Sequence, residues 1–144
     1  MKFGIVVFFI MFYSVLASQE IGSIEKGEHF VKLYKSDNLY SFKYSDIKPK
    51  SLKKEYSFSF SNKQHFYSIL INGFNNAKGH QIILKTANDT IVKLNYKNIK
   101  GELLLFVYQN NLIEKSSGRS TFFSKAQIIE LFEGENLRIE VSQN

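Results

Sequence analysis

Hydrophobic and polar residues alternate along much of the chain, and this alternation predicts β-strands. In residues 55–61, Tyr56, Phe58 and Phe60 alternate with three serines. A period of two places one set of side chains on each face of a strand, so we expect the aromatic face to be buried. The same alternation recurs in residues 39–44, 90–96 and 136–141.

Two short segments are hydrophobic on both faces, residues 65–71 and residues 103–108. Such segments are typical of central strands that are covered on both sides. Residues 124–132 fit two structures: a helix that begins after Ser124 and ends before Gly134, or a strand. We favour the strand, because a short segment between strands gains its stability from the sheet.

Turn-forming residues separate these segments, so that strands are expected about every 10–15 residues, as in antiparallel sandwiches. The turns are predicted at residues 36–38, 72–79, 87–89, 98–101, 109–111 and 133–136. The predicted fold class is all-β: a single antiparallel β-sandwich, Ig-like or jelly-roll-like, over residues 30–144.

The N-terminus has the pattern of a secretory signal peptide over residues 1–17. Lys2 precedes an uncharged hydrophobic run at residues 3–16, and Ala17 supplies the small residue before the cleavage site. The run is shorter than the roughly 20 residues of a spanning helix, so an uncleaved anchor is the less favoured alternative. We therefore expect a secreted or cell-envelope protein with no spanning helix after cleavage. The polar residues 18–29 are predicted to form a flexible N-terminal arm.

The amino-acid composition excludes several kinds of active site. The 144-residue chain has no Cys, which excludes disulfides, thiolate metal sites and Cys nucleophiles. Its three His residues lack a paired acid at a familiar spacing, and no nucleophile-elbow or zinc-protease motif is present. Carboxylates at Glu130, Glu133 and Glu135 fit a solvated turn or, less commonly, a Ca²⁺ site. We predict no catalytic residues, no metal and no cofactor.

The positive charge is modest and mostly dispersed, with a formal net charge of +6. Lys48, Lys50, Lys53 and Lys54 form its one concentrated cluster. These lysines could contact an anionic polymer, although a solvated connection between strands is the favoured explanation. Nucleic acid is not expected as a partner, because Lys dominates over Arg and no recognition motif is present.

Three segments carry a family resemblance. Residues 90–96 read TIVKLNY, residues 100–108 read KGELLLFVY before a polar turn, and residues 131–141 read LFEGENLRIEV. The stretch from about residue 74 to 141 resembles small secreted or lipoprotein β-sandwich domains of low-GC Gram-positive bacteria and, more loosely, the bacterial pre-peptidase C-terminal domain. The resemblance implies a β-sandwich outside the cytoplasm and no catalytic residues. The Cys that anchors such lipoproteins is missing here.

Those domains continue with one more strand after the last matched segment, and this chain ends at Asn144. We therefore predict an edge strand marked by Leu137, Ile139 and Val141, with an open groove beside it. An unpaired strand edge can accept a strand from a partner or from a second copy of the chain.

These features together predict a non-enzymatic binding module that presents a sheet face or edge to a protein or glycan at the cell surface. Two alternatives stay open. One is an immunity or inhibitor protein directed against a secreted toxin or enzyme. The other is a small secreted hydrolase whose site is assembled from dispersed His and carboxylate residues.

Overall fold

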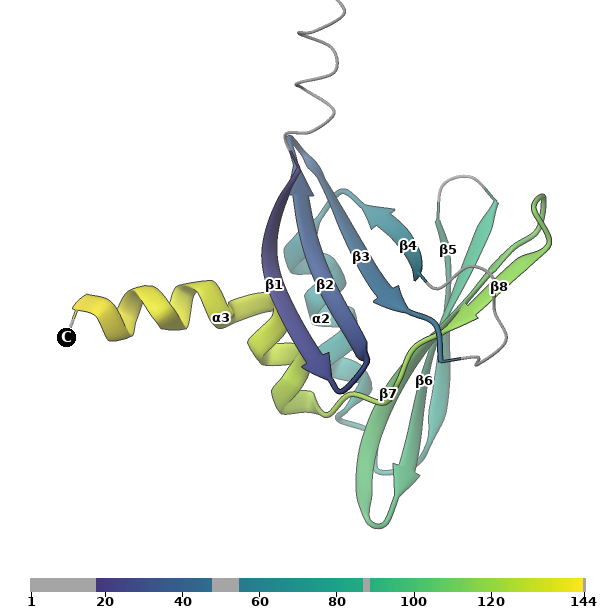
Figure 1. The fold of residues 1–144 in the computed structure, drawn as a ribbon. Helices are drawn as coiled ribbons and strands as arrows, with labels where there is room; N and C mark the ends of the chain where they lie inside the picture. Colours follow the sequence, from purple (N-terminus) through teal and green to yellow (C-terminus); the bar gives the residue numbers. More distant parts are fainter. Residues whose placement is uncertain (1–17, 48–54, 87–88, 144) are drawn as a thin grey trace, which may run out of the picture.

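The computed structural model describes residues 18–47, 55–86 and 89–143, which form eight strands and two helices (Figure 1). The predicted signal peptide lies outside these residues. The elements in chain order are β1 (Gln19–Lys26), β2 (His29–Ser36), β3 (Leu39–Ser45), β4 (Glu55–Phe60), α2 (Lys63–Gly73), β5 (His80–Thr86), β6 (Thr90–Ile99), β7 (Glu102–Asn111), β8 (Ser116–Arg119) and α3 (Lys125–Gln143).

The strands form two four-stranded antiparallel sheets, ordered β1-β2-β3-β4 and β5-β6-β7-β8. The predicted all-β class and its sandwich of two antiparallel sheets are confirmed. Figure 1 shows that α2 and α3 lie against one face of the β1–β4 sheet. None of the helices among the described residues is long and apolar enough to cross a bilayer.

The inner face of the β1–β4 sheet is built from rows of large side chains. Val31 lies opposite Tyr44, which in turn lies opposite Tyr56, and all three are buried. The next row repeats this arrangement with Leu33, Phe42 and Phe58. The alternation seen in the sequence therefore places one aromatic face inside, as expected of a half-buried strand.

The inner face of the β5–β8 sheet is smaller and more aliphatic. Val92 and Leu94 on β6 and Leu105 and Val107 on β7 are fully buried. Phe123 extends the sheet after β8, because its backbone exchanges hydrogen bonds with Leu105 at 2.7 and 2.8 Å. The segment after β8 is thereby held in place just before α3 begins.

Polar contacts join the two sheets where β3 meets β7 and β8. The buried Tyr44 hydroxyl donates to Gln109 Oε1 at 3.0 Å and to the Gly118 carbonyl at 3.3 Å. Gln109 Nε2 donates to the Ser57 carbonyl of β4 at 3.1 Å. Just beyond β3, the Ile47 amide donates to the Arg119 carbonyl at 3.0 Å. The segment that follows β3 is therefore tied to the end of β8.

The strand predicted over residues 65–71 is wrong, because these residues lie in α2. Asn62 is the N-cap, and its side chain accepts a hydrogen bond from the His65 amide at 2.9 Å. Phe66 and Leu70, four residues apart, share the buried face of the helix. A run that is apolar on both faces does not distinguish a buried helix from a central strand.

The strands favoured for residues 124–132 and 136–141 are also wrong, because both segments belong to α3. Ser124 Oγ accepts from the Gln127 amide, and Gln127 Oε1 accepts from the Ser124 amide, which is a capping box. Once a helix has begun, each further residue adds a backbone hydrogen bond at little cost. The predicted edge strand at Leu137, Ile139 and Val141 is therefore helical.

The flexible arm predicted over residues 18–29 is wrong as well, because these residues contain β1. Its backbone pairs with β2 along most of its length, and Gly27 forms the connecting turn with φ +61°. Ile24 is buried, whereas most neighbouring side chains are polar. Backbone pairing across the hairpin therefore determines this strand more than hydrophobic patterning does.

Gly22 allows α3 to approach β1 closely, and this contact gives a testable prediction. A Cβ at Gly22 would lie 2.0 Å from the Leu131 carbonyl oxygen. Gly22→Ala is expected to lower the free energy of unfolding by about 1–3 kcal/mol, because the helix must shift to avoid the clash. Urea unfolding followed by circular dichroism measures this change.

Gly134→Ala is the matched control. Its nearest neighbour would be Glu130 Cγ at 3.8 Å, an ordinary contact distance. Alanine favours the helix over glycine by up to about 1 kcal/mol, so this variant should be as stable as the natural chain or more stable. Equal effects of the two substitutions would contradict close packing at Gly22.

Candidate functional site

A groove of about 300 Å³ lies where β4, α2 and β5 come together. Its lining is mostly apolar, with polar groups at several positions. The lining residues are Phe58, Ser59, Phe60, Ser61, Asn62, His65, Phe66, Ile69, Leu84, Lys85 and Thr86. They come from two segments that are more than ten residues apart in the sequence.

The first wall is an aromatic cluster between β4 and α2. The Asn62 cap turns the chain directly from β4 into α2, which brings Phe66 over Phe60 with ring centroids 4.4 Å apart. Phe66 also meets Phe58 edge-on at 5.7 Å. Such stacked and T-shaped pairs add to the stability gained by burial, so this wall is well fixed.

The second wall is β5, which contributes Leu84 and Thr86. Leu84 lies opposite the buried Val92, and the Thr86 hydroxyl donates to the Thr90 carbonyl at 3.2 Å. Both β4 and β5 are edge strands of the described sheets. An edge strand can pair with an added strand, so the groove combines apolar pockets with backbone hydrogen-bonding groups.

The polar groups of the groove suit binding. Asn62 Oδ1 is used in the helix cap, and Ser59 Oγ lies 3.2 Å from Ser41 Oγ on the neighbouring strand. His65 and Lys85 have exposed side chains. Hydrogen-bonding groups around an apolar centre are the usual composition of a recognition site.

The three histidines lie in different surroundings. His29 Nδ1 is 3.5 Å from Ser45 Oγ, His65 is exposed on α2, and the His80 ring stacks on Tyr96 with centroids 4.7 Å apart. Within the described ranges, no three His or carboxylate side chains come close enough to hold a metal ion.

The lysines and the edge-strand residues singled out from the sequence are not among the residues described as lining the groove. Lys48, Lys50, Lys53 and Lys54 lie outside the described residues. The residues proposed for the edge strand lie in α3 instead. Sequence reasoning missed the groove because α2 was taken for a strand, although Asn62 and the spacing of Phe66 and Leu70 were the available signals of a capped helix.

Burial raises the pKa of Tyr44 far above its ordinary value, with smaller contributions from Asp46 and from Tyr56 and Tyr108. Burial likewise raises the pKa of Tyr96, whose hydroxyl donates to the Leu70 carbonyl at 2.7 Å. Both hydroxyls therefore stay protonated in the folded chain and act as hydrogen-bond donors, Tyr44 between the two sheets and Tyr96 between β6 and α2.

We find no protein-family model, no curated protein and no solved structure that matches the chain. The resemblance of residues 74–141 to secreted β-sandwich domains thus stays a prediction.

The contact between the sheets predicts a specific effect of Tyr44→Phe. The variant keeps the ring but leaves Gln109 Oε1 and the Gly118 carbonyl without this donor, which should lower the free energy of unfolding by about 1–3 kcal/mol at pH 7. Tyr34→Phe, on the outer face, should change it by less than about 0.5 kcal/mol. Urea unfolding of both variants tests the difference.

Burial of the Tyr44 hydroxyl also predicts that the free energy of unfolding depends on pH. The folded chain retains the Tyr44 proton at pH values where the unfolded chain, with an ordinary pKa of 10.0, releases it. The stability that the buried Tyr44 hydroxyl contributes is therefore fully present below about pH 10 and is lost as the pH rises above it. Unfolding measured from pH 8 to about pH 11 should show a shallower decline in Tyr44→Phe than in the natural chain. Parallel curves would contradict the burial of this hydroxyl.

Proposed function

We propose that the chain is a non-enzymatic binding module that holds an extended segment of a protein partner in the groove between β4 and β5. The observation that carries this proposal is the position of an apolar groove between two edge strands. A strand added to either edge gains backbone hydrogen bonds, and alternate side chains of that strand enter the apolar pockets.

The two edge strands favour a strand as the ligand, and the rigidity of the groove lowers the cost of binding. The aromatic wall of Phe60 and Phe66 is stacked, and β5 is paired with β6 throughout its length. Binding therefore requires little reorganisation, and the entropy cost falls mainly on the ligand. We also propose that the module is exported, on the basis of the signal-peptide pattern.

A peptide-display experiment tests the groove. Peptides selected from a random library on the chain should have alternating hydrophobic residues, and their affinity is measured by fluorescence anisotropy. Leu84→Ser should weaken binding at least about tenfold, because it removes an apolar wall. Hydrogen exchange should show new protection of β4 or β5 amides when peptide is bound.

Ile83→Ser is the matched control, because Ile83 is the neighbouring residue of the same strand and points to the opposite face. It should leave the peptide affinity unchanged. Peptides that bind Leu84→Ser as well as they bind the natural chain would overturn the proposal, as would a library that yields no binder.

Export has its own test. Mass spectrometry of the chain produced with its N-terminal segment in a secreting host should give a mature protein that begins at Ser18. An intact N-terminus on the recovered protein would contradict a cleaved signal.

A further inference from the structure

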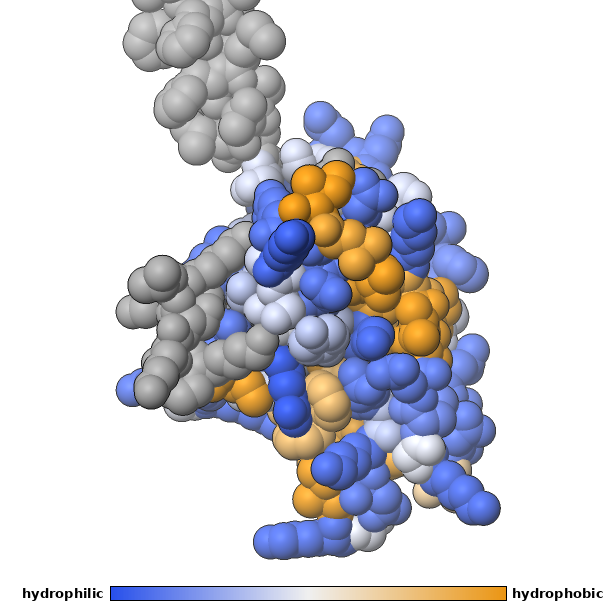
Figure 2. Space-filling view, turned by 90° about the vertical axis from the view of Figure 1, so that its right-hand side faces the viewer, coloured by the Kyte–Doolittle hydropathy of each residue, from blue (hydrophilic) through white to orange (hydrophobic). Residues whose placement is uncertain are grey.

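The outer face of the β5–β8 sheet differs from an ordinary solvated face. Ile83, Lys93, Tyr108 and Arg119 form one row across its four strands. Their sequence neighbours Val92, Leu94 and Val107 are fully buried, so this row points outward. Figure 2 looks onto this side of the molecule and shows a band of hydrophobic residues with hydrophilic residues on both sides.

Two cations of this face, Lys93 and Arg119, lie over aromatic rings. Lys93 Nζ is 5.9 Å from the centroid of Tyr108. The Arg119 guanidinium is 4.0 Å from the centroid of Phe106 and 5.6 Å from that of Phe122. A cation held by a ring keeps its full charge, which stays available to an anionic partner.

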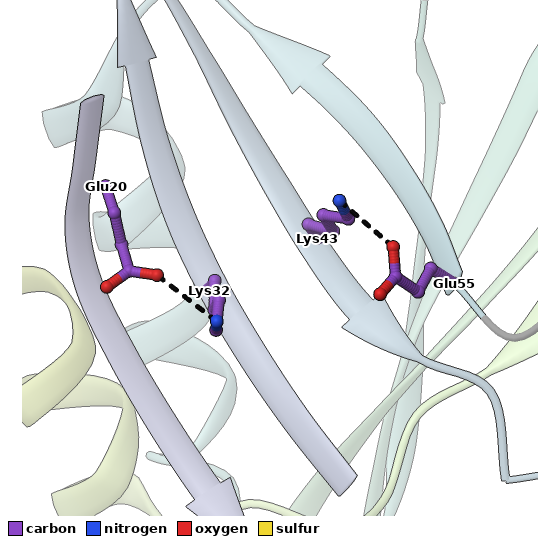
Figure 3. Close-up of polar contacts among 4 residues, drawn as sticks. All are labelled: Glu20, Lys32, Lys43 and Glu55. Atoms are coloured by element: carbon purple, nitrogen blue, oxygen red, sulfur yellow. Dashed lines mark ion pairs between the residues drawn. The ribbon is translucent and has the colours of Figure 1, made fainter. Parts of the chain in front are cut away.

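Lysines of the other sheet also lie over rings, Lys32 over Phe30 at 5.2 Å and Lys43 over Tyr34 at 5.9 Å, but there the two lysines are ion-paired as well. Both ion pairs found among the described residues lie on the β1–β4 sheet, where Glu20 pairs with Lys32 at 3.5 Å and Glu55 with Lys43 at 3.0 Å (Figure 3). Those pairs neutralise part of that face. On the β5–β8 sheet, positive charge is concentrated instead among apolar side chains.

The β7–β8 turn adds two protruding hydrophobic residues. Leu112 is 53% exposed and Ile113 is 72% exposed, while Ile83 on β5 is 60% exposed. The turn is held in shape by Asn111 Oδ1, which accepts from the Ile113 and Glu114 amides at 3.0 and 2.8 Å. Its hydrophobic side chains are therefore presented to solvent by a fixed backbone.

A third hydrogen bond ties this turn to the neighbouring hairpin, from the Leu112 amide to the Asp89 carbonyl at 3.1 Å. Figure 1 shows the β7–β8 hairpin extending away from the body of the molecule. A projecting tip has no walls to enclose a partner's side chain, but it can enter a bilayer interface.

We propose that the outer face of the β5–β8 sheet and the β7–β8 turn dock onto an anionic lipid bilayer. Leu112 and Ile113 enter the interface, and the cations beside them face the headgroups. The cations are Lys85, Lys93, Lys115 and Arg119. They outnumber the three nearby carboxylates, which are Glu114 in the turn, Asp89 before β6, and Asp46, whose Oδ1 accepts from the Arg119 amide at 3.2 Å.

Vesicle flotation tests this proposal with the chain from Ser18 onward, which contains every residue of the described core. We expect binding to phosphatidylcholine vesicles with about one third phosphatidylglycerol, weak binding to pure phosphatidylcholine, and loss of binding at high salt. Leu112→Ser combined with Ile113→Ser should lower the partition constant at least about tenfold. Lys85→Ser combined with Lys93→Ser should lower it about five-fold for each lysine.

The matched controls are Leu39→Ser and Lys35→Ser, in the β2–β3 hairpin of the other sheet. Leu39 is 48% exposed, so its substitution tests whether any exposed leucine supports bilayer binding. Both controls should bind as the natural chain does. Turn variants that bind normally, or equal binding to both vesicle types, would overturn the proposal.

A fluorescence experiment reports on the turn directly. The chain has no Trp, so Ile113→Trp introduces a single reporter and Leu39→Trp its control. Anionic vesicles should shift the emission of Ile113→Trp to the blue and leave Leu39→Trp unchanged. Binding to soluble polyphosphate that is as tight as vesicle binding, and that the turn variants do not weaken, would identify a polyanion site and overturn bilayer docking.

Discussion

The packing of Phe66 against the aromatic face of the β1–β4 sheet is the interaction on which the rest of the structure depends. Its ring contacts Phe42, Phe58, Phe60 and Phe132, which joins two strands and both helices. Full burial of an aromatic side chain contributes about 1.5–3 kcal/mol, and ring geometry adds to this. Phe66 can reach all four rings only if the chain turns into a helix directly after β4.

That turn also determines where the second sheet begins. Because α2 packs under the first sheet, the C-terminal end of β5 lies beside β4, and the two strands line one groove. The Tyr44–Gln109 hydrogen bond joins the two sheets at a second place, where β3 meets β7 and β8. The groove is thus a consequence of how the core closes.

The sequence predicted the elements whose patterning is local. Residues 39–44, 55–61 and 90–96 lie in strands, and their alternating residues face the core as expected. Strand pairing and helix capping, which alternation does not report, decided the failures. β1 is polar and owes its strand to pairing with β2, while the alternation of Leu137, Ile139 and Val141 is overridden by a helix that starts at Lys125.

The candidate groove was beyond prediction for a related reason. Its walls come from residues 58–69 and 84–86, and alternation within a strand identifies faces but not neighbouring strands. The outer face of the β5–β8 sheet was easier to predict from the sequence, because Lys93 and the aromatic residues of β7 alternate with core residues. Its row of two cations with Ile83 and Tyr108 appears only once the register of four strands is known.

The contact of α3 with β1 has a consequence for how the chain is made. All the strand pairings of the two sheets join strands that follow one another in the chain. Each pair can therefore form as soon as it leaves the ribosome. Gly22 and Leu131, by contrast, meet across more than a hundred residues. One flank of the first sheet must therefore stay uncovered until α3 has emerged, long after β1 and β2 have paired.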